Sequence, residues 1–350
     1  MRITNNMMAA STIKNINNAA TRLNTAQARM SSQQKIQLPS DDPVVATRAI
    51  KYRNYVASVA QYKKNVADVT SWQKVTETAI DDLDDVIQSV RELTVKASSD
   101  TLTDTDRAAI KTEVEELQKQ AVQIMNTSYA GRYVFGGYST GEEPYKLVTT
   151  DLGSAVTFKG QYLSVGAAIS ADTDDAEITA FYTDNADNLY ESTEAQSIQY
   201  NIGFNAKTTV NIEGQNVTGA DTGSNLFNTF SKLLLALDGE TSYKTADTST
   251  DPATVTTNSL SITGMLDDLD ADQNRLLTAQ AVLGARMKYV SQVADRLSTD
   301  YSTYSTLMSD NEDVDVSEAS IEESTAQYVY QASLTVGAKV ITKTLVDYIA

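Results

Sequence analysis

The sequence predicts a mainly α-helical protein. The two ends of the chain form a long antiparallel coiled-coil or helical-bundle rod, and a β-rich (α+β) domain is inserted in the middle. Three observations predict this. Residues 1–130 contain no glycine, whereas 12 of the 15 glycines lie between residues 131 and 239. Apolar residues recur at three- and four-residue spacing on both sides of that region. Short β-prone runs bounded by turn-forming residues lie inside it.

The first predicted helix carries a thin apolar stripe and is followed by two prolines. The stripe consists of Ile13, Ile16, Leu23 and Met30, with Gln27 on the same face. Pro39 and Pro43 predict a helix stop and restart, because Ser40, Asp41 and Asp42 are favoured N-cap residues and proline suits the first helical turn. A short amphipathic helix is marginal alone in water. We therefore expect this helix, and its counterpart at the other end, to become ordered only on assembly.

Three further helices follow from the same periodicity. Residues 44–97 predict one helix about 80 Å long, at 1.5 Å per residue. The threonine- and aspartate-rich run 100–106 predicts a connection to a third helix that ends at Gly131. Near the other end, an apolar stripe continues in one heptad register over 262–308, which favours coiled-coil packing. The predicted rod core is Leu83, Val90, Leu117, Leu276, Leu283, Val290 and Leu297.

The middle and the extreme C-terminus complete the pattern. Residues 133–135, 156–158 and 208–210 predict strands, 226–237 predict an amphipathic helix closed by Gly239, and 240–258 predict a loop. A last helical stripe lies near the C-terminus, and we expect its residues to form an assembly interface together with the first stripe: Leu334, Ala338, Ile341, Leu345 and Ile349.

Charge and composition exclude several functions. The formal charge of −18 argues against nucleic acid as a partner, because phosphate binding needs a basic face. The absence of cysteine and histidine removes disulfides, thiolate zinc sites and Ser-His-Asp triads. No apolar run is long enough for membrane insertion, and no cleavable secretory signal is visible. Residues 1–35 carry five basic and no acidic side chains, whereas 301–350 carry two basic and eight acidic ones, so the ends should pair.

Three clusters of acidic residues are candidates for cation binding or for acid–base catalysis. Residues 268–274 imitate the start of a calcium loop, but Gln273 and Ala279 stand where its glycine and bidentate glutamate belong. That run and the cluster at 81–85 are better explained as solvated helix faces. The acids at 172–177 suit a loop. Phosphate-binding glycine patterns are missing, so we expect no cofactor, no metal site and no enzyme. An enzyme in the acidic middle domain is the least favoured alternative.

Several sequence motifs of this chain resemble those of a known protein family. The run Gln37–Pro43, followed by Ala46 and Ala49, resembles the N-terminal signature of bacterial flagellins. Residues 133–137 resemble the turn out of the family's helical domain, and 309–315 resemble the C-terminal hinge of the members that join hook to filament. The resemblance covers about 1–140 and 258–350. Gln33 stands where many relatives have glycine, which predicts a first helix that continues past it.

The resemblance implies a structural axial component of the bacterial flagellum. It would form a homo-oligomeric ring at the hook–filament junction, between a hook-side hook-associated protein and flagellin. It would be secreted through the flagellar type III channel and held beforehand by a cytoplasmic export chaperone. Three domains are expected: 1–36 with 312–350 as an inner coiled coil, 40–135 with 258–310 as the rod, and 136–257 as an outer variable domain. The alternatives are flagellin itself or a secreted coiled-coil adhesin.

Overall fold

The computed structural model describes residues 5–99, 102–163, 168–190, 196–219, 224–247 and 254–340. Its contacts divide the chain into two compact units, residues 1–61 with 296–350 and residues 62–295. Two long helices, α2 (Pro43–Ala97) and α7 (Gly264–Glu312), contribute residues to both units. The fold is therefore mainly α with an inserted β-containing region, as the glycine distribution predicts. The division into three domains remains a prediction.

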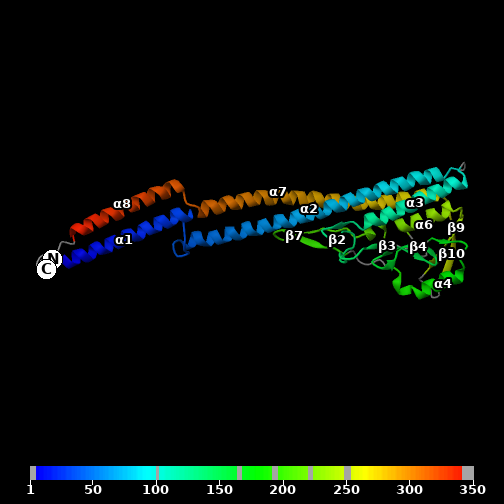
Figure 1. The fold of residues 1–350 in the computed structure, drawn as a ribbon, viewed down its shortest axis with the longest axis horizontal. Coiled ribbons are helices and arrows are strands. Elements are labelled where there is room, and N and C mark those ends of the chain that lie inside the picture. The colour runs from blue at the N-terminus through cyan, green and yellow to red at the C-terminus, as the bar shows by residue number, and fades with distance from the viewer. Residues whose placement is uncertain are drawn as a thin grey trace. The chain divides into compact units, whose positions relative to one another are not determined.

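The first unit contains α1 (Asn5–Ser32) and α8 (Val316–Val340), which lie side by side (Figure 1). They are antiparallel, since Arg29 on α1 approaches Glu322 on α8 at 3.6 Å while Ile16 lies against Gly337. The opposite ends of the chain therefore pair, as their opposite charges predict. Of the final stripe, Ile341, Leu345 and Ile349 lie outside the described residues.

The segment between α1 and α2 shows how the chain stops one helix and starts the next. Helix α1 ends at Ser32, and Gln33 takes a left-handed conformation with φ of 55°. The expectation that glutamine in place of glycine lengthens this helix is therefore wrong, because Gln33 adopts the glycine-like backbone itself. Helix α2 starts at Pro43, and the Asp42 carboxylate caps it by accepting hydrogen bonds from Val44 N and Val45 N at 2.9 and 3.0 Å.

The second unit is built on α2, α3 (Asp104–Met125), α6 (Leu226–Leu237) and α7. Thr103 and Asp106 form a capping box at the start of α3, which explains the helix restart after the 98–103 connection. Side chains from these helices and from several strands share one hydrophobic core, and Ala155, Ile169, Ile178 and Tyr182 form a second, smaller cluster. Of the predicted rod core, Leu83, Val90, Leu276, Leu283, Val290 and Leu297 are buried, and Leu117 is half-buried.

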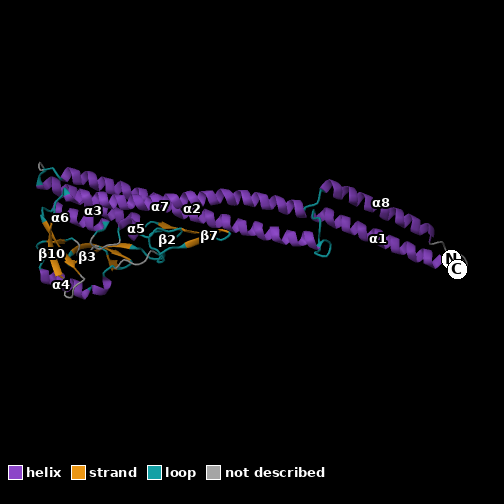
Figure 2. Ribbon diagram, turned by 180° about the vertical axis from the view of Figure 1, so that it is seen from behind, coloured by secondary structure: helices purple, strands orange, loops and turns teal. Residues whose placement is uncertain are grey.

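Most strands lie near α3 and α6, whereas the hairpin at 199–209 lies further along α2 (Figure 2). Sheet pairing is antiparallel throughout the named strands. A three-stranded sheet joins β3 (Tyr145–Thr150), β4 (Gly153–Phe158) and β5 (Gln161–Tyr162); a second joins β10 (Thr254–Ser259), β9 (Ser242–Asp247) and β6 (Ile169–Ser170); and two hairpins pair β1 (Ser128–Tyr129) with β2 (Arg132–Tyr133) and β7 (Gln199–Gly203) with β8 (Ala206–Thr209). The shorter helices are α4 (Asp175–Asp184), η1 (Ala186–Asn188) and α5 (Gln215–Thr218).

Two expectations about the middle region need correction. Helix α3 ends at Met125, and Gly131 instead lies in the two-residue turn of the β1–β2 hairpin, where Ala130 and Gly131 both have positive φ. Residues 240–258 are not simply a loop, because they contain β9 and β10. Their threonines pair across the strands, as Thr245 and Thr256 do through their hydroxyls at 2.8 Å. Threonine favours strands that have one exposed face, so a threonine-rich composition does not by itself indicate a loop.

Gln73 is a polar side chain enclosed in the apolar interior of the second unit. It is fully buried on α2, and neither its Nε2 nor its Oε1 has a hydrogen-bond partner within the described residues. A buried unsatisfied polar group costs about 1–3 kcal/mol. We therefore predict that Gln73→Leu raises the free energy of unfolding by about that amount. Urea unfolding followed by Trp72 fluorescence measures it, and the same substitution at the solvated Gln88 should have little effect.

Candidate assembly surface

The α1–α8 pair is held by a seam of small side chains. A Cβ atom added to Gly337 would come within 2.8 Å of Ile16 Cδ1 and 3.5 Å of Thr12 Cγ2, so the helices approach closely only because glycine stands there. On α1 the buried side chains are Ala19 and Ala26, and Ala319, which lies near the start of α8, is 2% exposed. Small residues permit close backbone approach but bury little apolar area. Since burial stabilises by about 25 cal/mol per Å², this seam alone gives a weak pair.

The large apolar side chains of the pair lie mostly outside the seam. Ile321 and Tyr328 on α8 are 68% and 74% exposed. Val336 is also exposed, and these three residues are spaced seven and eight positions apart along α8, on a side that does not carry Ala319 and Gly337. We call Ile321, Tyr328 and Val336 the outer face of α8. An apolar helix face that is solvated in one chain is typical of a surface that another molecule covers.

Only part of the predicted interface lies in the seam. Ile16, Leu23 and Met30 are half-buried on α1, whereas Ile13, Leu334 and Ala338 are exposed. Ile16 therefore lies against α8, at Gly337, and Leu23 and Met30 follow it at seven-residue spacing on α1, whereas the other three face solvent. Sequence reasoning missed the outer face of α8. Its signal is present as apolar residues seven and eight positions apart, which form a stripe separate from the one that begins at Leu334.

A groove of about 470 Å³ runs along one side of the pair. Its floor is apolar, with Ala26 from α1 and Ala326 and Val329 from α8. Arg22 and Arg29 line one side of it and Glu322 the other. A helix from a neighbouring molecule could lay apolar side chains on such a floor and polar ones along its edges.

The predicted signature 39–43 belongs to a segment that is tied to the region after α7. Asp41 Oδ2 accepts hydrogen bonds from Gln37 N and Leu38 N at 3.2 and 3.1 Å, which closes a turn before Pro39 and Ser40. Upstream, Lys35 N donates to Glu312 O at 2.7 Å and Val314 N donates to Gln33 O at 3.0 Å. The turn between α1 and α2 is therefore fastened to the turn between α7 and α8 by backbone hydrogen bonds.

Glu312 is the buried anchor of this double turn. Its side chain is 7% exposed, and both its oxygens accept from Arg53 Nε at 2.9 Å, with a further bond from Arg53 Nη2. The forked geometry makes this pair stronger than an ordinary exposed ion pair.

We predict that Glu312→Ala increases protease cleavage and amide exchange of residues 33–42 by about tenfold, the equivalent of roughly 1.4 kcal/mol of local stability. Glu322→Ala serves as the control, because the Arg29–Glu322 pair is exposed on both sides and such pairs contribute about 0–1 kcal/mol. Equal effects of the two substitutions would contradict the anchoring role.

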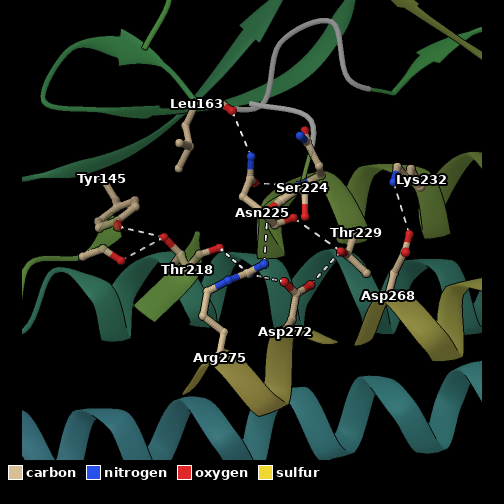
Figure 3. A network of polar contacts seen from close by, with 12 residues as sticks. Tyr145, Leu163, Thr218, Ser224, Asn225, Thr229, Lys232, Asp268, Asp272 and Arg275 are labelled. Carbon is tan, nitrogen blue, oxygen red and sulfur yellow. Dashed lines mark hydrogen bonds and ion pairs between the residues drawn. The ribbon is translucent and has the colours of Figure 1, made fainter. Parts of the chain in front are cut away.

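The structure corrects two of the acidic candidates. Of the acids at 172–177, Asp174 caps helix α4 and Asp175 and Glu177 lie in its first turn, so the segment is not only a loop. The run 268–274 is the second. Asp272 is 4% exposed and is not part of a solvated face. It accepts a hydrogen bond from Thr229 Oγ1 at 2.7 Å and from Arg275 Nη1 at 2.5 Å (Figure 3). Burial raises the pKa of the Asp272 carboxyl despite these donors. The cluster at 81–85 is mostly exposed, and Gln280 and Gln273 of α7 donate to Asp81 and Asp84.

Arg275 joins Asp272 to two backbone carbonyl groups of the middle region. Its Nη1 also donates to Thr218 O, and its Nη2 donates to Ser224 O, both at 3.3 Å (Figure 3). Thr218 Oγ1 in turn lies 3.0 Å from the buried Tyr145 hydroxyl. We call Asp272, Arg275, Thr218 and Thr229 the α7 clamp. Its groups are partnered within the protein, so the arrangement suits the attachment of the middle region to α7 rather than catalysis.

The described residues offer neither a metal-binding cluster nor a membrane-spanning helix. Among them, no three Asp or Glu side chains are placed to hold a metal ion. None of their helices combines the length and the apolar character that crossing a bilayer requires.

Known proteins are similar to the N-terminal region of this chain and to nearly its full length. The family described as bacterial flagellin N-terminal helical region matches residues 3–140. Flagellar hook-associated protein 3 of Escherichia coli is 26% identical over 340 residues, which cover 95% of this chain and 96% of that protein. A flagellin of Clostridium tyrobutyricum is 31% identical over 128 residues, but these cover only 37% of this chain and 34% of that protein.

A solved structure gives the same result for the fold. It belongs to a protein of Vibrio parahaemolyticus assigned as flagellar hook-associated, and it has a TM-score of 0.57 over 78% of this chain and all of that one, at 15% identity. The sequence resemblance to flagellins is thus strongest at the N-terminus, whereas the end-to-end similarity is to a hook-associated protein. Residues 3–140 of the chain are accordingly similar to the N-terminal helical region of bacterial flagellins, and over nearly its full length the chain is similar to flagellar hook-associated protein 3.

Proposed function

We propose that this protein is a non-enzymatic axial component of the bacterial flagellum that forms the junction between hook and filament. The similarity to flagellar hook-associated protein 3, which extends over 95% of this chain and 96% of that protein, carries the proposal. The flagellin similarity covers about a third of the chain, so a bulk filament subunit is the less favoured reading. In this role the protein adapts two mechanically different tubes to each other.

The partners follow from that position. Copies of the chain form a ring, in contact with a hook-side hook-associated protein on one side and with flagellin on the other. The α1–α8 pair lies in the inner part of the tube, and the α2–α7 helices supply lateral contacts. The exposed outer face of α8 and the groove beside Ala26 and Ala326 support this arrangement, because assembly would bury them.

Export through a narrow channel accounts for two features of the chain, its apolar C-terminal segment and its lack of cysteine. The protein is secreted unfolded through the flagellar type III channel and folds outside the cell at the hook–filament junction. A cytoplasmic export chaperone covers the apolar C-terminal segment until then. The absence of cysteine is consistent with a chain that must thread a channel and fold without oxidative enzymes.

Deletion of the gene tests the proposal. We expect cells with complete hooks that release unassembled flagellin into the medium and do not swim, with swimming restored by the wild-type gene. Cells that keep full-length filaments would favour a secreted adhesin instead. A purified protein that alone forms long filaments would identify it as flagellin.

A further inference from the structure

Three polar side chains from distant parts of the chain meet inside the second unit. Lys159 Nζ lies 2.6 Å from Glu213 Oε1 and 3.3 Å from the carboxamide oxygen of Gln196. The Glu213 side chain is 1% exposed and that of Lys159 is 21% exposed. Lys159 Nζ also lies 4.8 Å from the centre of the Phe158 ring, which shields one side of it. An amine, a carboxamide and a carboxylate are therefore held together in a largely water-excluded site.

The local fold positions each of the three groups. Lys159 and Gly160 form the two-residue turn between β4 and β5, and both have positive φ, as such hairpin turns require. Glu213 Oε2 accepts hydrogen bonds from Gln196 N at 3.1 Å and from Gln215 Nε2 at 2.7 Å, so the carboxylate is fixed on its second oxygen. The backbone around Gln196 is fixed by Asn211, whose Nδ2 donates to Gln196 O at 2.8 Å.

The carboxamide of Gln196 is also polarised. Tyr138 N donates to Gln196 Oε1 at 2.8 Å, the distance at which backbone N–H groups stabilise an oxyanion during acyl transfer. Gly137 makes this approach possible, because a Cβ there would lie 2.6 Å from Gln196 Oε1 and 3.1 Å from both Glu213 Oε1 and Lys159 Nζ. Since Nζ lies 3.3 Å from Oε1 and a C=O bond is about 1.23 Å long, the carboxamide carbon lies at most about 4.5 Å from the amine.

We propose that Lys159 and Gln196 form an intramolecular isopeptide bond, with Glu213 as the proton-transfer group. Glu213 Oε1 takes a proton from the Lys159 ammonium, and the Nζ lone pair attacks the Gln196 carboxamide carbon while the carbonyl electron pair moves to Oε1 beside Tyr138 N. The tetrahedral centre collapses with cleavage of the carbon–Nε2 bond. Glu213 transfers its proton to the leaving nitrogen and accepts the excess proton of Nζ, which then leaves with the ammonia as ammonium ion. One amide replaces another, so no oxidant or cofactor is consumed.

The bond would give this chain a covalent cross-link that it otherwise lacks. The protein has no cysteine, so disulfides cannot tie its loops together. An isopeptide at this site would close a loop from residue 159 to residue 196 and fasten it beside the turn at Gly137. A cavity of about 430 Å³ lined by Gln196, Glu213, Asn216 and Arg286 adjoins the site and provides a route for the released ammonia. A covalent cross-link suits a component under mechanical load. Its formation depends only on the contacts among Lys159, Gln196 and Glu213.

Mass spectrometry of the full-length purified protein tests the proposal. We expect an intact mass lower than the sequence mass by one molecule of ammonia. After protease digestion, fragment spectra should place the link between Lys159 and Gln196. Lys159→Arg is the matched control, because a guanidinium keeps the ion pair with Glu213 but is not acylated. It should show its full sequence mass, and Glu213→Gln should show the same. Both variants should melt at a lower temperature than the cross-linked protein.

Either of two results would overturn the inference. The first is a wild-type protein at its full sequence mass, with the Lys159 and Gln196 peptides recovered separately. The second is an ammonia loss that persists in Lys159→Arg, which would place the loss elsewhere in the chain. Circular dichroism of the variants distinguishes loss of the bond from failure to fold. An unlinked protein would leave the flagellar role untouched, because that role is tested by the deletion phenotype.

Discussion

Replacing Arg275 with alanine is expected to lower the free energy of unfolding of the 62–295 unit by about 3–5 kcal/mol. The substitution leaves the Asp272 carboxylate buried without its cation, and it strips Thr218 O and Ser224 O of a donor. Asp272 would keep only the Thr229 hydroxyl. Urea unfolding followed by Trp72, the single tryptophan, measures the loss.

The pH dependence of this variant identifies the cause. Burial already raises the pKa of Asp272, and removal of Arg275 raises that pKa further. An aspartate whose folded pKa exceeds its unfolded pKa is least costly where it is protonated, so the variant should regain stability as the pH falls through the folded pKa. The deficit relative to wild type should therefore be smaller at acid than at neutral pH.

Two controls accompany this prediction. Arg91→Ala removes the partner of Asp270 from an ion pair that is exposed on both sides, and it should change stability little. Arg275→Lys keeps the charge but cannot reach Asp272, Thr218 and Ser224 together, so it should fall between wild type and Arg275→Ala. A stable Arg275→Ala protein at neutral pH would show that the α7 clamp does not hold the middle region.

The second large effect is expected on assembly and not on folding. The double substitution Ile321→Ser and Tyr328→Ser should abolish swimming while the melting curve of the isolated protein stays unchanged. Both side chains are more than half exposed, so the isolated chain loses little packing. If assembly buries them, each contributes about 1.5–3 kcal/mol, and together they weaken association by about a hundredfold or more.

A matched pair on the same helix controls for this effect. Gln327→Ser and Gln331→Ser change exposed polar residues of α8 and should leave swimming intact. Swimming assays and the amount of flagellin released into the medium give the readout. Normal swimming of the Ile321→Ser, Tyr328→Ser cells would mean that the outer face of α8 is not covered in the flagellum.

The sequence predicts the helices of this protein well because their signals are local and repeated. The stripe that contains Leu276, Leu283 and Val290 keeps one register, and these residues are buried in the structure. Pro43 and Asp42 define a helix start through their own chemistry, without help from the rest of the fold.

The sequence-based predictions fail at positions whose structure is determined by contacts with residues distant in the sequence. Asp272 looks solvated in the sequence, and only the fold brings Thr229 and Arg275 to it. Gln33 takes a left-handed backbone although glycine suits that conformation better, because the hydrogen bond from Val314 N and the neighbouring turn contacts hold it there. The meeting of Lys159, Gln196 and Glu213 carries no sequence signal, since a hairpin turn, a loop and the residues before α5 supply one residue each.

Amide hydrogen exchange of the dilute, unassembled protein tests the central claim most directly. We expect residues 5–32 and 316–340 to gain their stability from neighbouring molecules, because the seam between α1 and α8 buries mainly alanines. We therefore predict fast exchange for these residues and strong protection for residues 76–94 of α2, which lie in the core of the second unit. Protection of α1 and α8 equal to that of α2 in the single molecule would contradict this prediction.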